Sequence, residues 1–87
     1  MITGSQMRAA RALLGIDQKT LASLAGVSVP TIQRMESSPN TVRGVIESLT
    51  RVVSALEGAG VELIAEQAHS QACGRGVRLK EASSTQA

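Results

Sequence analysis

The chain contains no phenylalanine, tyrosine or tryptophan, and it has only one cysteine and two prolines. Proteins that bind RNA or single-stranded DNA stack bases on aromatic side chains, so the lack of aromatic residues argues against both classes. The single cysteine, Cys73, cannot form an internal disulfide, which is typical of a reducing compartment. Apolar stretches are short, and the N-terminus has no basic segment followed by an apolar one. We therefore expect neither a membrane span nor a signal peptide, and a cytoplasmic protein.

The length and charge of the chain indicate one small domain with a mild basic bias. With 87 residues, the chain must bury most of its apolar surface in a single core, which leaves no room for a separate enzyme domain. The net charge of +2 and the pI of about 9.3 permit nucleic-acid binding without establishing it. The sequence contains no glycine-rich phosphate loop and no clustered acidic residues. We expect no enzyme activity and no cofactor.

One pair of residues suggests a metal or a nucleophile at first sight. His69 and Cys73 lie four residues apart in a polar segment, but a zinc site usually needs four ligands and no second pair exists. The Gly and Gln neighbours of Cys73 supply no base that would activate its thiol. We therefore predict no metal site and no catalytic residue.

Residues 18–37 have the spacing of a helix, a tight corner and a second helix. Gly26 stands at the corner, where a residue without a Cβ atom can take positive φ. Apolar or small residues of this block fall at Leu21, Ala22, Ala25, Val27, Ile32 and Met35. Leu21 and Ala25 share one face of the first predicted helix, and Ile32 and Met35 share one face of the second. The other face of the second helix carries polar side chains that a purely structural protein does not need.

Capping residues predict where three of the helices begin. Thr3 and Gln6 have the spacing of a capping box, and Asp17 and Ser28 are N-cap residues for the next two helices, with Pro30 in the first turn of the third. A fourth, longer segment repeats apolar residues at i, i+3, i+4 and i+7. The predicted helices span residues 4–14, 18–25, 29–37 and 41–59.

Two short alternating segments, 61–65 and 76–80, follow the helices and predict a β-hairpin. Two strands alone are marginally stable, so they must pack on the helices or pair with a second copy. The apolar residues of the two strands are Val61, Leu63, Val77 and Leu79. We expect a domain of this size to cover them incompletely, which makes the hairpin a candidate dimer contact. We divide the chain into a helical domain over 1–60, the hairpin extension over 61–80 and a disordered tail over 81–87.

The pattern over roughly residues 5–58 resembles the phage-repressor and Cro class of helix-turn-helix proteins, the Xre family. The resemblance implies a mainly α fold of four to five helices in a lambda-repressor-like arrangement, followed here by a short β-hairpin or strand pair. It also implies that Gln18 clamps a DNA phosphate at the start of the second helix. The resemblance further implies an ion pair between Arg11 and Glu36, which match positions near the ends of the first and third helices.

In this arrangement the helix over 29–37 enters the major groove of DNA. Arg34 is the best candidate for base reading, because a guanidinium can pair with guanine O6 and N7. Val29 can contact a thymine methyl group, and Thr31 and Gln33 can hydrogen-bond a base or a phosphate. The other candidates contact the DNA backbone. The full set of candidate DNA-binding residues is Gln18, Lys19, Ser28, Val29, Thr31, Gln33, Arg34 and Arg43.

Two function classes follow from this sequence. The first is a small, sequence-specific DNA-binding regulator, a repressor or autoregulator that acts as a homodimer on an inverted repeat. The alternative is a helix-turn-helix module that binds another protein, such as an antiactivator that grips a transcription regulator or an antitoxin that binds a toxin. Residues 1–38 carry only four basic residues against two acidic ones, and this weak charge favours the alternative. We favour DNA binding as the primary function.

Overall fold

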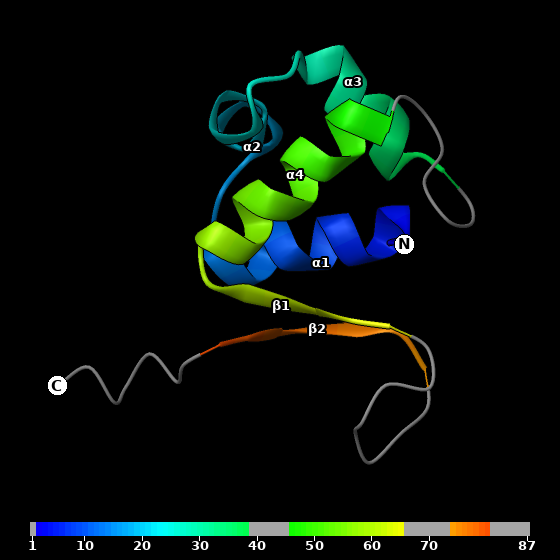
Figure 1. Ribbon diagram of the computed structural model, residues 1–87, viewed down its shortest axis with the longest axis vertical. Helices are drawn as coiled ribbons and strands as arrows, with labels where there is room; N and C mark the ends of the chain where they lie inside the picture. Colours follow the sequence, from blue (N-terminus) through cyan, green and yellow to red (C-terminus); the bar gives the residue numbers. More distant parts are fainter. Residues whose placement is uncertain (1, 39–45, 66–73, 81–87) are drawn as a thin grey trace, which may run out of the picture.

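The computed structural model describes residues 2–38, 46–65 and 74–80. In these residues four helices precede two strands. The elements are α1 (Gly4–Leu14), α2 (Gln18–Ala25), α3 (Val29–Glu36), α4 (Ile46–Gly58), β1 (Val61–Ile64) and β2 (Gly76–Leu79). Helices α1 and α4 form the middle of the molecule, with α3 at one end and the strand pair at the other (Figure 1). The predicted mainly α fold with a C-terminal strand pair is confirmed.

The first helix begins at the predicted capping box. The Gln6 backbone N–H donates to Thr3 Oγ1 at 3.1 Å, and the Thr3 N–H donates to Gln6 Oε1 at 3.0 Å. This exchange satisfies two N–H groups that a helix start otherwise leaves without partners. Gly15 ends α1 with a φ of 69°, in the left-handed region that favours glycine. The predicted bounds of α1 are confirmed.

The later helices also follow their predicted caps. Asp17 accepts a hydrogen bond from the Thr20 N–H at 2.8 Å, and Ser28 accepts one from the Thr31 N–H at 3.3 Å. The predicted bounds of α2 are confirmed, whereas α3 ends at Glu36, one residue before the predicted end. The predicted first turn of the fourth helix, over 41–45, lies outside the described residues. Its last helical residue is Gly58, one before the predicted end.

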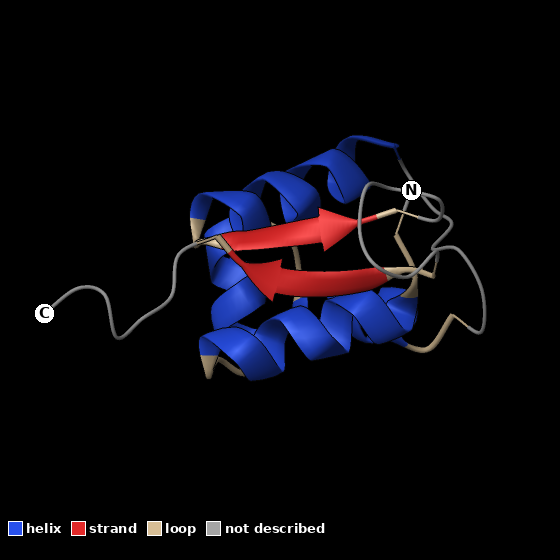
Figure 2. Ribbon diagram, turned by 90° about the horizontal axis from the view of Figure 1, so that it is seen from below, coloured by secondary structure: helices blue, strands red, loops and turns tan. Residues whose placement is uncertain are grey.

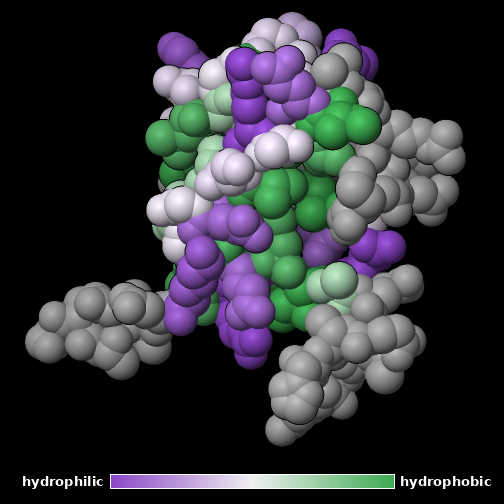
Figure 3. Space-filling model, in the orientation of Figure 1, coloured by the Kyte–Doolittle hydropathy of each residue, from purple (hydrophilic) through white to green (hydrophobic). Residues whose placement is uncertain are grey.

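One hydrophobic core joins the helices to the hairpin. Its fully buried large side chains are Met7, Leu21, Ile32, Val52, Leu56 and Val61. The core therefore takes a residue from every helix and from β1. Some apolar surface is left in contact with solvent, as Figure 3 shows on one face of the molecule. Among the described residues, the most exposed large apolar side chain is that of Ile46 at the start of α4, which is 80% exposed.

The hairpin packs one face against the helices. The strands are antiparallel and pair Val61 with Leu79 and Leu63 with Val77, so these four side chains share one face. Val61 is fully buried and the other three are partly buried against the core. Figure 2 shows the two strands lying side by side across the helices. Helices α1 and α4 lie beneath this face, yet Leu63, Val77 and Leu79 are only partly buried, so the face is covered incompletely, as the sequence predicts.

Gln6 fastens the hairpin to the first helix. Its side-chain Nε2 donates to the backbone oxygens of Ile64 at 3.0 Å and Gly76 at 2.9 Å, while its Oε1 belongs to the capping box. The residue is 5% exposed. Both amide protons and the amide oxygen of one buried side chain are thus used, and the two strands are tied to the start of α1.

Gln6→Glu is expected to lower the free energy of unfolding by about 1–3 kcal/mol, because a carboxylate supplies no donor to two buried carbonyl oxygens. Urea denaturation followed by circular dichroism measures this loss. Gln6→Ala removes the same donors without adding a charge and should lose less at neutral pH. Equal stability of wild type and Gln6→Glu would show that these bonds do not hold the hairpin.

Candidate nucleic-acid interface

The corner between α2 and α3 has the geometry that the sequence predicts. Gly26 ends α2 with a φ of 71°, and the Val27 N–H donates to the Ala22 carbonyl oxygen at 3.0 Å. The side chain of Arg51, from α4, donates to the Gly26 carbonyl oxygen at 3.3 Å. Ile32 and Met35 of α3 are buried in the core. These contacts fix α3 so that its opposite face is presented to solvent.

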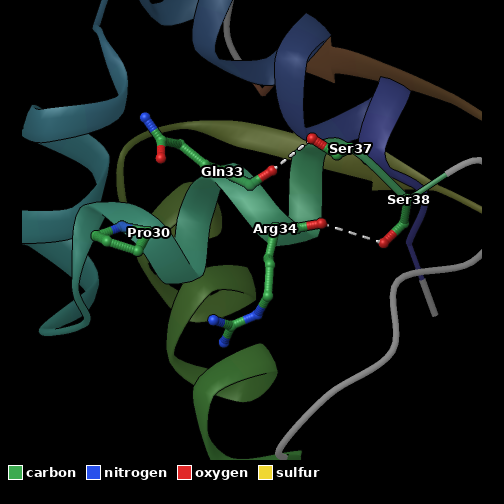
Figure 4. A pocket seen from close by; sticks show the side chains of 5 residues that line it. All are labelled: Pro30, Gln33, Arg34, Ser37 and Ser38. Atoms are coloured by element: carbon green, nitrogen blue, oxygen red, sulfur yellow. Dashed lines mark hydrogen bonds between the residues drawn. The ribbon is translucent and has the colours of Figure 1, made fainter.

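The outer face of α3 forms a shallow hollow, lined by Pro30, Gln33, Arg34, Ser37 and Ser38. In Figure 4 the side chains of Gln33 and Arg34 point away from each other on either side of the helix. Ser37 Oγ donates to the Gln33 carbonyl oxygen at 2.8 Å, and Ser38 Oγ donates to the Arg34 carbonyl oxygen at 3.4 Å. The two serines thus satisfy carbonyl groups at the end of α3. The side chains of Gln33 and Arg34 have no hydrogen-bond partner within the described part of the chain.

The residues at the start of α3 are less free than the sequence suggests. The hydroxyl groups of Ser28 and Thr31 are 2.8 Å apart and hydrogen-bond each other. Val29 is partly buried against the core. These three candidates therefore have structural roles already, and Val29 and Thr31 are only partly exposed, whereas Ser28 is exposed. Any contact they make with DNA must come from the exposed part of each side chain.

The start of α2 places two further candidates next to each other. Lys19 is exposed, and Gln18 is partly exposed and donates from Nε2 to Glu36 Oε1 at 2.9 Å. Sequence reasoning did not find this contact, because nothing in the local pattern relates the first residue of α2 to the last residue of α3. Arg43, the remaining candidate, lies outside the described residues.

Glu36 is the centre of a buried polar cluster. Arg11 Nε lies 2.6 Å from Glu36 Oε2, and Arg11 Nη2 donates to Glu36 Oε1 at 2.9 Å. Arg11 also donates from Nη1 to the Ile16 carbonyl oxygen at 3.3 Å. The Glu36 side chain is 3% exposed, and that of Arg11 is 20% exposed. The predicted ion pair is confirmed, and it is bidentate.

The surroundings of Glu36 keep it ionised. Burial is the largest single influence and raises the pKa of Glu36, but the hydrogen bonds from Arg11 and Gln18 and the charges of Arg11 and Arg8 together lower it below its usual value. The hydrogen bond to Glu36 likewise raises the pKa of Arg11. The carboxylate therefore remains charged at neutral pH, and its charge is balanced by that of Arg11.

Most of the basic side chains that the structure describes are engaged by other groups. Arg8 donates to the Glu36 carbonyl oxygen and to Ser5 Oγ. Further pairs join Arg51 to Glu47 at 2.8 Å, Arg78 to Glu62 at 3.0 Å, and Lys80 to the Glu57 carbonyl oxygen at 2.9 Å. In contrast, Lys19 and Arg34 have neither an ion pair nor a hydrogen bond in residues 2–38, 46–65 and 74–80. Both of these unpaired cations belong to α2 and α3.

Within the residues that the structure describes, no group of three His, Cys, Asp or Glu side chains could hold a metal ion. His69 and Cys73 lie outside the described residues. No helix in the described part of the chain is long and apolar enough to cross a membrane.

Comparison with known proteins agrees with this geometry. A family model described as "Helix-turn-helix" matches residues 7–43, which include α1, α2 and α3 from Met7 onward. A comparison with curated proteins found no match. The matched segment carries the two unpaired cations and the buried pair of Arg11 and Glu36. The family model that matches residues 7–43 is that of the Xre, Cro and phage-repressor type of helix-turn-helix, a family of DNA-binding regulatory domains.

Proposed function

We propose that the protein is a sequence-specific transcriptional regulator that inserts α3 into the major groove of double-stranded DNA. The observation that carries this proposal is the location of Lys19 and Arg34, because unpaired cations on the outside of a helix-turn-helix are free to meet a polyanion. The hairpin lies at the opposite end of the molecule from α3, which leaves the face of α3 open (Figure 1).

Each candidate has a separate role in this proposal. Arg34 reads a guanine through its O6 and N7 atoms, and Gln33 pairs with a neighbouring base or phosphate. Gln18 and Lys19 bind phosphates at the start of α2, where the helix dipole favours an anion. Ser28, Val29 and Thr31 contact the DNA from the start of α3, and Arg43 adds backbone charge.

We also propose that the regulator acts as a homodimer on an inverted repeat and represses transcription in the cytoplasm. A single reading helix of eight residues contacts only a few base pairs. Two linked copies double the contacts and raise the affinity without any new kind of interaction. An apolar hollow lined by Ile2, Ile46, Leu49, Thr50 and Val53 supports the dimer as a surface for a second copy.

Arg34→Ala is expected to remove the preference for the cognate site, with a loss of about 1–3 kcal/mol or roughly 5- to 150-fold in affinity. Gln18→Ala should instead weaken binding to all sequences, since phosphate contacts position the protein and base contacts specify the sequence. Selection from a random duplex pool, followed by mobility-shift titration on selected and random duplexes, separates the two effects. A homodimer predicts that the selected sequences contain an inverted repeat.

The matched control is Arg78→Ala. It removes the same charge from the hairpin, where Arg78 is paired with Glu62, and should change affinity much less than Arg34→Ala. Wild-type protein that shifts no duplex at micromolar concentration and about 50 mM salt, where electrostatic binding is strong, would overturn the proposal. Copurification with a larger regulator or a toxin through α3 would then favour the protein-binding alternative.

A further inference from the structure

The hydrogen bond between Gln18 and Glu36 links the two helices of the helix-turn-helix at one atom. Gln18 is the first residue of α2, and Glu36 is the last residue of α3. The bond runs from Gln18 Nε2 to Glu36 Oε1 at 2.9 Å. A carboxylate can only accept hydrogen bonds, so the amide nitrogen of Gln18, and not its oxygen, must face Glu36. The contact therefore fixes which way the Gln18 carboxamide is turned.

One of the two amide protons of Gln18 is left for a ligand. The nitrogen of a carboxamide carries two protons, and Glu36 takes one of them. The second proton has no partner among the residues that the structure describes, and the Gln18 side chain is partly exposed. The backbone N–H groups of Gln18 and Lys19 also lack intrahelical partners, as at the start of every α-helix. Lys19, the next residue of this first turn, is exposed and adds a positive charge.

Glu36 is itself held in place more firmly than a surface carboxylate. Arg11 binds both of its oxygens, and the side chain is 3% exposed. Arg11 comes from α1, so three helices meet at this one carboxylate. A group fixed in this way can impose its geometry on a partly exposed partner such as Gln18.

We infer that Glu36 is a positioning residue for phosphate binding: it orients the Gln18 carboxamide at the start of α2 so that the free N–H meets the DNA backbone. The inference rests on the proposed DNA-binding function. It adds that the phosphate contact of α2 and the base contacts of α3 are held at a fixed separation through Glu36. The nearby carboxylate of Asp17 accepts the Thr20 N–H and receives no hydrogen bond from Gln18.

A double-mutant cycle in DNA affinity tests this inference. Gln18→Ala is expected to weaken binding to selected and random duplexes by about tenfold, as for the loss of one hydrogen bond to a charged group. Glu36→Gln should weaken it several-fold although Gln18 is intact, because the single amide oxygen of the new side chain is taken by Arg11. The double variant should then bind no more weakly than Gln18→Ala alone.

A loss of stability must be separated from a loss of positioning. Gln6→Ala serves as the control, because it weakens hairpin docking without touching Glu36 or the DNA-facing helices, and it should bind duplex like wild type. All titrations are made at a temperature where circular dichroism shows each variant folded. The salt dependence of Gln18→Ala should stay close to that of wild type, since a neutral carboxamide releases no counterion when it binds a phosphate.

Two results overturn the inference. Additive losses in the double variant would show that Gln18 and Glu36 act independently, and wild-type affinity in Glu36→Gln would show that Gln18 needs no orientation. Either result leaves the proposed function standing, since wild type still binds. Failure of wild type to bind any duplex at about 50 mM salt would instead overturn the proposed function and this inference with it.

Discussion

Arg11→Ala is expected to lower the free energy of unfolding by about 3–5 kcal/mol at neutral pH, the range found when one partner of a buried ion pair is removed. The Glu36 carboxylate is 3% exposed and depends on Arg11 for two of its hydrogen bonds. Without Arg11 the Glu36 carboxylate stays buried, and the hydrogen bond from Gln18 and the more distant charge of Arg8 remain to stabilise its negative charge. The variant must therefore keep a poorly solvated carboxylate or bind a proton.

Removing Glu36 should lower the free energy of unfolding less than removing Arg11 does. Glu36→Ala leaves Arg11, whose side chain is 20% exposed and can reach water. The double variant should lose less than the sum of the single losses, and urea denaturation followed by circular dichroism measures all four proteins. The exposed pair Arg78 and Glu62 is the control, for which each alanine variant should lose at most about 1 kcal/mol. Additive losses at Arg11 and Glu36 would argue against the buried pair.

The difference in the free energy of unfolding between wild type and Arg11→Ala should also become smaller as the pH falls. In wild type the pKa of Glu36 lies below its usual value, so its stabilisation is complete above the unfolded-state pKa and is lost as the pH falls through the folded-state pKa. In Arg11→Ala the raising effect of burial is no longer opposed by Arg11, and the variant binds a proton at higher pH. The two stability curves therefore converge as the pH falls. Parallel curves would indicate that the lost stability has another cause.

The local parts of the fold could be predicted because each depends on residues close together in the sequence. The capping box of Thr3 and Gln6 and the glycine corner at Gly26 involve neighbours, and all were found from spacing alone. The pair of Arg11 and Glu36 came from resemblance, because no local rule joins residues 25 positions apart. The resemblance to the family therefore predicted an ion pair that residue spacing alone could not.

The contacts missed by sequence reasoning are all long-range and polar. Gln6 reaches carbonyl groups 58 and 70 positions further along the chain, which no periodic pattern encodes. Gln18 is predicted as a phosphate ligand from the resemblance. Its hydrogen bond to Glu36 is not encoded in the local sequence, because the start of α2 and the end of α3 meet only in the folded chain. Whether the hairpin packs on the helices or on a second copy was left open, because alternation predicts a shared face without showing what covers it.

A close backbone approach at Gly4 was also invisible in the sequence. A Cβ atom on Gly4 would lie 2.6 Å from the Glu36 carbonyl oxygen and 3.0 Å from that of Met35. These are backbone atoms of α3, so they cannot move aside as a flexible side chain can. Glu36 also accepts a hydrogen bond from Arg8 at the same carbonyl oxygen. The start of α1 thus packs on the end of α3 at a distance that only glycine allows.

Gly4→Ala is therefore expected to lower the free energy of unfolding by about 1–3 kcal/mol, as overpacked sites do, although alanine is the better helix former. Gly58→Ala is the matched control, since a Cβ atom there meets nothing within 4 Å and its φ is not positive. That variant should be as stable as wild type, or more stable by about 0.5–1 kcal/mol, because it reduces the entropy of the unfolded chain. Urea denaturation should thus show a lower free energy of unfolding for Gly4→Ala and an unchanged or higher one for Gly58→Ala. An equal gain in stability in both variants would show that α1 and α3 are further apart than this packing requires.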